Sequence, residues 1–87
     1  MDDTLTAANS KIDSPKKLGK IIRAKRLKDG LTQDETASLC GVGTRFISDL
    51  ENGKPTIELG KAIQVMNGLG LELLVSPRGW PSDKRVV

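Results

Sequence analysis

Apolar residues recur every three to four positions in the first third of the chain, and this period is typical of an amphipathic helix. It predicts a helix over residues 15–28, with Leu18 and Ile22 on its buried side. Ser14 is a suitable cap for this helix, and the proline that follows it has no N–H to leave unpaired. Gly30 is expected to end the helix in the left-handed conformation.

Residues 32–51 predict two short helices joined by a tight turn, over 32–39 and 44–51. Thr32 can cap the first of them, since its hydroxyl accepts a backbone N–H that has no partner inside the helix. Gly41 falls in the turn, where a positive φ costs glycine little. A capped helix, a glycine turn and an amphipathic helix together indicate a helix-turn-helix.

A last helix and a strand are predicted toward the C-terminus. Thr56 is placed to cap the helix. Its inward side is predicted to carry Ile57, Leu59, Ala62, Ile63, Met66 and Leu69. Residues 71–76 then alternate in the manner of a half-buried strand. The alternative is that this stretch is the frayed end of the preceding helix.

A single strand needs a partner, and the rest of the chain predicts none. We therefore expect it to pair with its own copy across the two-fold axis of a homodimer. The residues expected to make this contact are Leu71, Leu73, Leu74 and Val75. A chain of 87 residues buries only a modest core, so added stability from oligomerisation is a common solution.

The predicted fold is all-α, with four to five helices and one short C-terminal strand. Its segments are a flexible arm over 1–13, a helical domain over 14–70, the dimerisation strand over 71–76 and a flexible tail over 77–87. The arm and the tail are assigned as flexible because they are polar and lack apolar periodicity. Trp80 is the one notable residue of the tail.

Charge is distributed unevenly along the chain. The net charge is +3 and the isoelectric point is about 9.2, which gives a mild attraction to anionic partners. Seven of the 14 basic residues lie between Lys16 and Lys28, and no acid interrupts them until Asp29. Such a run is usually a solvated helix face, and the alternative is a DNA contact by Lys16, Lys17 or Lys20.

Composition argues against several classes of protein. The chain has one cysteine and no histidine, so neither a disulfide framework nor a cysteine-rich zinc site is expected, and no cofactor is implied. The sequence contains no pair of a nucleophile and a base at a spacing typical of a catalytic site, which argues against an enzyme. The first residues do not resemble a signal peptide and no apolar run reaches membrane-spanning length, so we expect a cytoplasmic protein without a membrane partner.

The chain from Leu18 to about Val75 resembles the Xre/Cro–C1-type helix-turn-helix family. The matching residues are Leu18-Gly19, Ile22-Arg23, Arg26, Gly30-Leu31-Thr32-Gln33, Ala37, Gly41-Val42, Ile47-Ser48 and Glu51-Asn52-Gly53. The resemblance implies a lambda-repressor-like domain that binds operator DNA as a homodimer. It also implies that Arg26 and Glu51 form an ion pair between helices, which is a structural role rather than a DNA contact.

Two residues depart from the family pattern. Thr36 stands where the family usually has an apolar residue, so its hydroxyl needs a local acceptor such as a carbonyl one turn back. Gly43 stands where the family often has a serine or threonine cap, and it offers DNA no side-chain contact. Phe46 is expected to border the core, the alternative being an apolar contact at the DNA face, and Cys40 is expected to be a small core residue.

The second helix of the motif is expected to lie in the major groove and to read bases with its outward side, opposite Ile47 and Leu50. The candidate base contacts are Thr44, Arg45, Ser48 and Asp49. Arg45 can donate two hydrogen bonds to guanine, and the alternative is a phosphate contact. Asp49 is expected either to accept from cytosine or to orient Arg45, four residues earlier.

The resemblance also suggests residues that contact the DNA backbone. These candidate phosphate contacts are Gln33, Asn52 and Lys54. Gln33 begins the first helix of the motif, where backbone N–H groups add donors, and the alternative is a solvated residue. Lys54 can neutralise a phosphate and release its counterions.

The predicted function is that of a sequence-specific, DNA-binding transcriptional repressor. The strand, the short tail and Trp80 also resemble the HipB-type antitoxins. This implies an antitoxin that represses its own toxin–antitoxin operon and binds a HipA-like kinase toxin. Trp80 would then contact the toxin, or it would fold back on its own dimer. The alternatives are a stand-alone regulator of the Xre type, and a protein-interaction module that has lost DNA binding.

Overall fold

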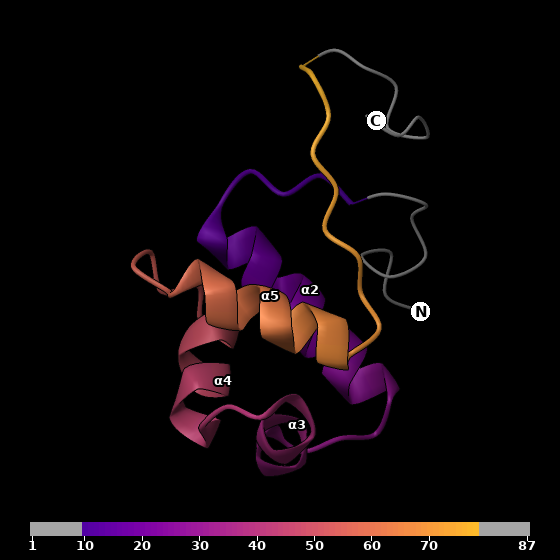
Figure 1. Ribbon diagram of the computed structural model, residues 1–87, viewed down its shortest axis with the longest axis vertical. Helices are drawn as coiled ribbons and strands as arrows, with labels where there is room; N and C mark the ends of the chain where they lie inside the picture. Colours follow the sequence, from indigo (N-terminus) through magenta and orange to yellow (C-terminus); the bar gives the residue numbers. More distant parts are fainter. Residues whose placement is uncertain (1–9, 79–87) are drawn as a thin grey trace.

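The computed structural model of the protein describes residues 10–78, and these residues contain four α-helices. The helices are α2 (Pro15–Lys28), α3 (Gln33–Cys40), α4 (Thr44–Glu51) and α5 (Leu59–Gly68). In Figure 1, α2 and α5 occupy the upper part of the helical domain, and α4 and α3 lie beneath them. The predicted all-α fold is confirmed.

The core is formed by one apolar side from each helix. Leu18 and Ile22 are buried on α2, and Ile47 and Leu50 are buried on α4, as predicted. Val65 of α5 is fully buried among them. Burying a side chain of this size stabilises the fold by about 1.5–3 kcal/mol relative to leaving it in water. This shared core holds α3 and α4 in a fixed arrangement.

Side-chain caps begin α2 and α3, as predicted. The Ser14 hydroxyl accepts a hydrogen bond from the Lys17 backbone N–H at 3.1 Å. The Thr32 hydroxyl accepts from the Glu35 N–H at 3.0 Å, and the Glu35 carboxylate accepts in return from the Thr32 N–H at 2.8 Å. A cap of this kind contributes about 1 kcal/mol. The reciprocal pair therefore fixes the residue at which α3 begins.

Gly19 allows α2 and α4 to approach closely. A Cβ atom at this position would lie 2.5 Å from the Leu50 carbonyl oxygen and 2.6 Å from the Glu51 carbonyl oxygen. Both oxygens belong to the backbone of α4, so no side-chain rotation can make room for the added carbon. Any larger residue would push the two helices apart.

Gly19→Ala is therefore expected to destabilise the protein by about 1–3 kcal/mol, a typical value for an overpacked core. The better helix propensity of alanine offsets about 1 kcal/mol of this loss, so the net destabilisation is expected to reach about 2 kcal/mol. Urea unfolding followed by circular dichroism measures the difference. The matched control is Gly60→Ala, because nothing lies within 4 Å of a Cβ built there on α5. Equal stability of the two variants would contradict the close approach.

The start of α5 differs from the prediction. The helix begins at Leu59 with Glu58 as its N-cap, so the prediction that Thr56 caps it is wrong. The physical reason is a turn ahead of the helix, in which the Ile57 N–H donates to the Lys54 carbonyl oxygen at 3.2 Å. This turn keeps Thr56 outside the helix.

The inward side of α5 also differs from the prediction. The buried side chains of α5 and its C-cap are Ala62, Val65, Met66 and Leu69. The prediction omits Val65 and wrongly places Leu59 and Ile63 in the core, since 60% and 36% of their surfaces are exposed. A helix buries only the stripe that faces its neighbours, and spacing alone does not show which of several apolar residues form that stripe.

Residues 71–78 follow α5 and form neither helix nor strand within the described chain. Gly70 has a φ of +75° and lies beyond the end of α5, so residues 71–75 do not continue the helix. Leu71 packs against the core. The exposed apolar side chains of this segment are Leu73, Leu74 and Val75. Pairing across a dimer needs a second subunit, so the predicted strand stays a prediction.

Three sequence predictions concern the ends of the chain or the membrane. Residues 10–13 of the predicted arm have no regular structure. The rest of that arm and Trp80 in the predicted tail lie outside the described residues. Among residues 10–78, no helix combines the length and apolar character that a membrane span requires.

Candidate nucleic-acid interface

Two local features form the turn between α3 and α4. Gly41 follows α3 in the left-handed conformation, with a φ of +73°, as predicted. The Val42 N–H then donates to the Ala37 carbonyl oxygen at 3.0 Å, and Gly43 caps α4 without a side-chain hydrogen bond. The two helices and this turn make up a helix-turn-helix, which lies in the lower part of Figure 1.

One side of α4 faces the core and the opposite side faces outward. Ile47 and Leu50 are buried, as predicted. The four candidate base contacts are exposed or half-buried, and they are Thr44, Arg45, Ser48 and Asp49. The structure therefore brings these four residues to the solvent side of one short helix, and their contacts with DNA stay a prediction.

Hydrogen bonds and an ion pair connect several of these polar side chains. The Thr44 hydroxyl donates to Asp34 Oδ1, on the first turn of α3, at 2.6 Å. Asp49 pairs with Lys54 at 3.6 Å, rather than with Arg45 as one reading of the sequence expected. Within residues 10–78, Arg45 has neither a hydrogen bond nor an ion pair. Its guanidinium is therefore available to a ligand.

The loop that follows α4 lies against the start of α2. Gly53 is buried with a φ of +75°, and a Cβ there would lie 2.7 Å from the Lys16 Cα. Asn52 and Lys54, on either side of Gly53, are both exposed. The structure thus places Lys16 beside the loop that carries two of the candidate phosphate contacts.

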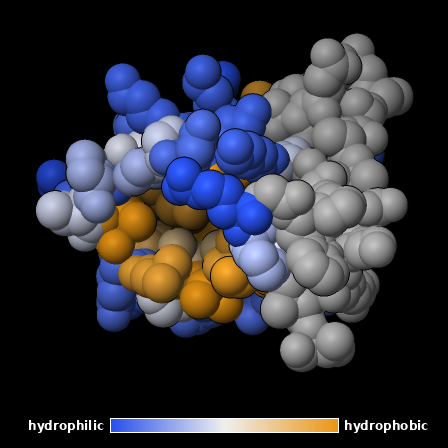
Figure 2. All heavy atoms as spheres, turned by 90° about the horizontal axis from the view of Figure 1, so that it is seen from above, coloured by the Kyte–Doolittle hydropathy of each residue, from blue (hydrophilic) through white to orange (hydrophobic). Residues whose placement is uncertain are grey.

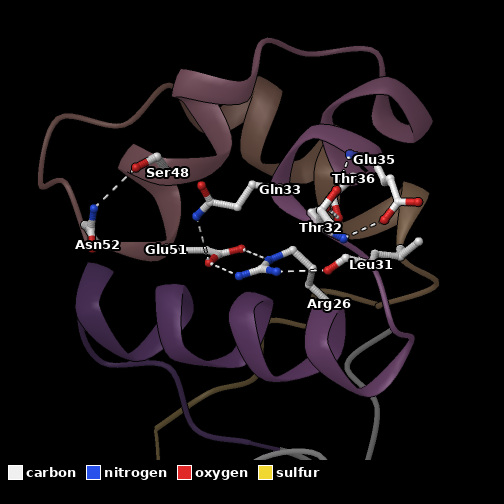
Figure 3. A network of polar contacts seen from close by, with 9 residues as sticks. All are labelled: Arg26, Leu31, Thr32, Gln33, Glu35, Thr36, Ser48, Glu51 and Asn52. Atoms are coloured by element: carbon white, nitrogen blue, oxygen red, sulfur yellow. Dashed lines mark hydrogen bonds and ion pairs between the residues drawn. The ribbon is translucent and has the colours of Figure 1, made fainter.

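A buried ion pair joins α2 and α4 (Figure 3). Arg26 donates from Nε to Glu51 Oε2 at 2.6 Å and from Nη2 to Glu51 Oε1 at 3.0 Å. Arg26 Nη1 donates to the Leu31 carbonyl oxygen at 2.9 Å. Only 9% of the Arg26 side chain and 4% of the Glu51 side chain are exposed. The structural role expected for Arg26 and Glu51 is confirmed.

The protonation state of Arg26 follows from this geometry. The hydrogen bond to Glu51 raises the pKa of Arg26 above its ordinary value, and this outweighs the lowering effect of burial. The guanidinium therefore keeps its charge although it is buried, and Glu51 supplies the balancing carboxylate. Gln33, a candidate phosphate contact, also donates to this carboxylate, from Nε2 to Glu51 Oε1 at 3.2 Å.

Thr36 is accommodated in the way that the sequence predicts. Its side chain is fully buried, and its hydroxyl donates to the Thr32 carbonyl oxygen, one turn back, at 2.9 Å. Its buried hydroxyl is thereby satisfied. The departure from the family pattern at this position therefore leaves α3 intact.

Gln64 holds the C-terminal end of α3, a role that sequence reasoning missed. Its Nε2 atom donates to the Cys40 carbonyl oxygen at 2.7 Å and to the Gly41 carbonyl oxygen at 3.3 Å. These carbonyls come at a helix end, where no N–H within the helix can reach them. The sequence offers only one signal, a polar residue next to buried positions of α5, and this does not reveal its partner.

Phe46 borders the core, as predicted. It is half-buried and packs against the buried cluster. The ammonium of Lys61 lies 6.0 Å from the centre of its ring, at the outer limit of a cation–π contact. Phe46 therefore connects α4 to α5, and the alternative of an apolar contact at the DNA face is not needed to explain it.

Cys40 is buried at the end of α3, as predicted, with only 6% of its surface exposed. Its thiol donates to the Val65 carbonyl oxygen at 3.6 Å, and a Cβ at Gly68 would lie 2.5 Å from its sulfur. Burial raises the pKa of the Cys40 thiol above its ordinary value. The burial of the thiol and its raised pKa both lower its reactivity, because the accessible thiolate is the nucleophile.

We expect Cys40 to react with a disulfide reagent at least tenfold more slowly in the folded protein than in urea at pH 8, because burial and a raised pKa both suppress the accessible thiolate. The chain has one cysteine, so absorbance of the released thiol reports on this site alone. Because the pKa of Cys40 is raised, the reaction rate of the folded protein should still increase at pH values where the rate of an exposed thiol no longer increases. Equal rates in the folded and unfolded states would contradict the burial.

The part of the chain that the structure describes offers no group of three acidic, histidine or cysteine side chains able to hold a metal ion. The exposed polar residues around α3 and α4 form a surface that carries hydrogen-bond donors and also the carboxylates of Asp34 and Glu35. Arg45 and Lys54 supply positive charge to it, and Lys16 lies beside it. Such a surface can bind an extended anion such as a nucleic-acid backbone.

Comparison with known proteins identifies the motif. A family model described as helix-turn-helix matches residues 22–75. An uncharacterised HTH-type transcriptional regulator of Sinorhizobium fredii is 46% identical over 63 residues, which make up 72% of this chain and 83% of the relative. The ImmF control region 10 kDa protein of Bacillus phage phi105 is 36% identical over 61 residues, which make up 68% of each chain.

Solved structures of HipB are similar to this chain. HipB in a HipA-HipB-O2-O3 complex superimposes with a TM-score of 0.74 at 27% identity, and the match covers 80% of this chain and 99% of that chain. HipB in a HipB-O4 20mer complex superimposes with a TM-score of 0.73 at the same identity. The match to the family model, together with the 46% identical regulator, shows that this chain belongs to the helix-turn-helix family of DNA-binding transcriptional regulators.

Proposed function

We propose that this protein is a dimeric repressor that binds a specific operator in double-stranded DNA. One observation carries the proposal: Arg45 is exposed in the first turn of α4 and has no partner among residues 10–78, while Ile47 and Leu50 hold that helix on the core. A helix held in this way can enter the major groove with its first residues toward the base edges. The proposed base contacts are Thr44, Arg45, Ser48 and Asp49.

The proposed phosphate contacts flank this helix on two sides. Gln33 lies at the N-terminus of α3, where the first backbone N–H groups of a helix and its dipole favour an anion. Asn52 and Lys54 lie in the loop that follows α4. The ion pair of Lys54 with Asp49 spans 3.6 Å between exposed or half-exposed side chains, so a phosphate can compete for the ammonium.

An exposed apolar surface supports the proposed homodimer. Figure 2 shows apolar residues gathered around a hollow on the upper face of the molecule, the end at which α2 and α5 lie in Figure 1. The exposed large apolar side chains on α5 and beyond it are Leu59, Ile63, Leu73, Leu74 and Val75. Apolar surface of this kind is commonly covered by a partner. We propose that a second copy covers it, with residues 71–76 pairing as strands.

We further propose that the protein is an antitoxin that binds a HipA-like kinase toxin. The support is the similarity to HipB, which extends over 99% of the HipB chain in the HipA-HipB-O2-O3 complex. Trp80 is the proposed toxin contact. A stand-alone regulator is the second candidate, favoured by relatives described as a transcriptional regulator and as a phage control-region protein.

A gel shift with the DNA upstream of the gene tests the repressor proposal. We expect a retarded band at low salt that weakens steeply as salt rises, because phosphate contacts release counterions. No band at low salt would instead favour a protein-interaction module that has lost DNA binding.

Co-expression with the neighbouring gene tests the antitoxin proposal. A neighbouring kinase-like protein should co-purify with the wild-type chain and should be lost from a Trp80→Ala variant that still binds DNA. A gene neighbourhood without a kinase-like coding sequence, or a kinase-like neighbour that never co-purifies, would leave the stand-alone regulator as the function.

A further inference from the structure

The Gln33 side chain is tied to the buried ion pair of the domain (Figure 3). Its Nε2 atom donates to the same carboxylate oxygen of Glu51 that accepts from Arg26 Nη2. Arg26 also donates from Nη1 to the carbonyl oxygen of Leu31, two residues before Gln33. One guanidinium and one carboxylate therefore hold both the start of α3 and the side chain of its first residue.

Hydrogen-bond chemistry fixes which way the Gln33 amide faces. A carboxylate only accepts hydrogen bonds, so the amide must turn its nitrogen rather than its oxygen toward Glu51. Figure 3 shows the amide oxygen directed away from that carboxylate. One amide N–H and the oxygen remain, and neither has a further hydrogen bond within residues 10–78. The amide is thus anchored by one N–H, while its second N–H is left for a ligand.

We propose that Arg26 and Glu51 are positioning residues for Gln33, which they orient for its phosphate contact without touching DNA themselves. The identity of the ligand rests on the proposed function. A side chain that is held before binding loses less conformational freedom when the complex forms. The backbone donors at the N-terminus of α3 then act on the same anion. The buried pair therefore contributes to DNA affinity in addition to its contribution to the fold.

Arginine suits this arrangement in a way that lysine does not. The planar guanidinium donates to both oxygens of Glu51 and, at the same time, to the Leu31 carbonyl oxygen. An ammonium keeps the charge but cannot reproduce this fork of donors. Arg26→Lys should therefore keep a positive charge beside Glu51 and keep the chain folded, while it releases the orientation of the Gln33 amide.

Nuclear magnetic resonance tests the orientation without DNA. The chain has only two glutamines, Gln33 and Gln64, so their side-chain amide signals are readily assigned. In the wild-type protein we expect the Gln33 amide to be restrained and shifted from free glutamine, and in Arg26→Lys to move toward free glutamine. Gln64, which donates to the Cys40 carbonyl oxygen, is the internal control and should not change. A freely rotating Gln33 amide in the wild-type protein would overturn the proposal.

DNA affinity tests the consequence. Gln33→Ala is expected to weaken binding of a selected DNA duplex about tenfold in the wild-type background, but only about threefold in the Arg26→Lys background. Lys54→Ala is the matched control, because Lys54 pairs outside this network and its effect should be the same in both backgrounds. Thermal unfolding confirms that each variant is folded at the assay temperature.

Two results of this cycle would count against the inference in different ways. If Gln33→Ala has the same effect in both backgrounds, the ion pair does not position the amide for DNA. If the wild-type protein binds no duplex at all, the proposed function fails and the role of the pair in DNA binding fails with it. The amide signals decide the orientation itself in either case.

Discussion

Replacing Glu51 by alanine is expected to lower the free energy of unfolding by about 3–5 kcal/mol, the loss seen when one partner of a buried ion pair is removed. The variant leaves the Arg26 guanidinium buried at 7% exposure with no counter-charge. It also removes the acceptor for Gln33. Urea unfolding followed by circular dichroism measures the loss.

Glu58→Ala is the matched control for this prediction. Glu58 pairs with Lys61 at 3.6 Å, and the side chains of both residues are more than half exposed. An exposed pair contributes only about 0–1 kcal/mol, because water and salt screen it. If Glu51→Ala is no less stable than Glu58→Ala, the ion pair between α2 and α4 does not hold the domain together.

Arg45→Ala is expected to remove about 1–3 kcal/mol of discrimination at one base pair of each half-site. The physical reason is that a guanidinium donates two hydrogen bonds to the O6 and N7 atoms of guanine, and alanine leaves both unmade. Stability should not change, because Arg45 is exposed and has no partner within the described residues. Selection of bound DNA by the variant and the wild-type protein measures the loss of preference.

Arg23→Ala controls for the loss of one positive charge. Arg23 is exposed on α2, outside the helix-turn-helix, so its removal should leave base preference unchanged at every position. A uniform loss of affinity for all sequences in Arg45→Ala, with no change in preference, would show that Arg45 contacts phosphate instead of a base.

Local chemistry explains why much of the fold could be predicted from the sequence. Ser14, Thr32 and Gly41 act on their own helix ends, within a few residues of chain, so their types and positions were enough. The pair of Arg26 with Glu51 lies 25 residues apart, and no local rule connects the two. It was predicted only through the resemblance to a family.

Tertiary packing explains what could not be predicted. Leu59 and Ile63 have the same apolar character as the buried Val65, and only the position of α5 against its neighbours distinguishes them. The hydrogen bonds of Gln64 and Gln33 reach acceptors 24 and 18 residues away. A polar residue at a helix surface carries no sign of such a distant acceptor, so these roles emerge only in three dimensions.

In the candidate site too, the sequence predicts the placement of side chains but not their partners. The outward placement of Thr44, Arg45, Ser48 and Asp49 follows from the helical period once Ile47 and Leu50 are assigned to the core. Their partners do not follow from it. The helical spacing favours Arg45, four residues earlier, as a partner of Asp49, yet Asp49 pairs with Lys54 in the next loop.

Selection of bound duplexes from random DNA by the full chain tests the central claim most directly. We expect enrichment of one two-fold symmetric site, with half-sites about one helical turn or a multiple of it apart, because a dimer presents two copies of α4 to successive major grooves. Recovery of sequences with no shared motif, or of a single motif without two-fold symmetry, would contradict a dimeric, sequence-specific repressor.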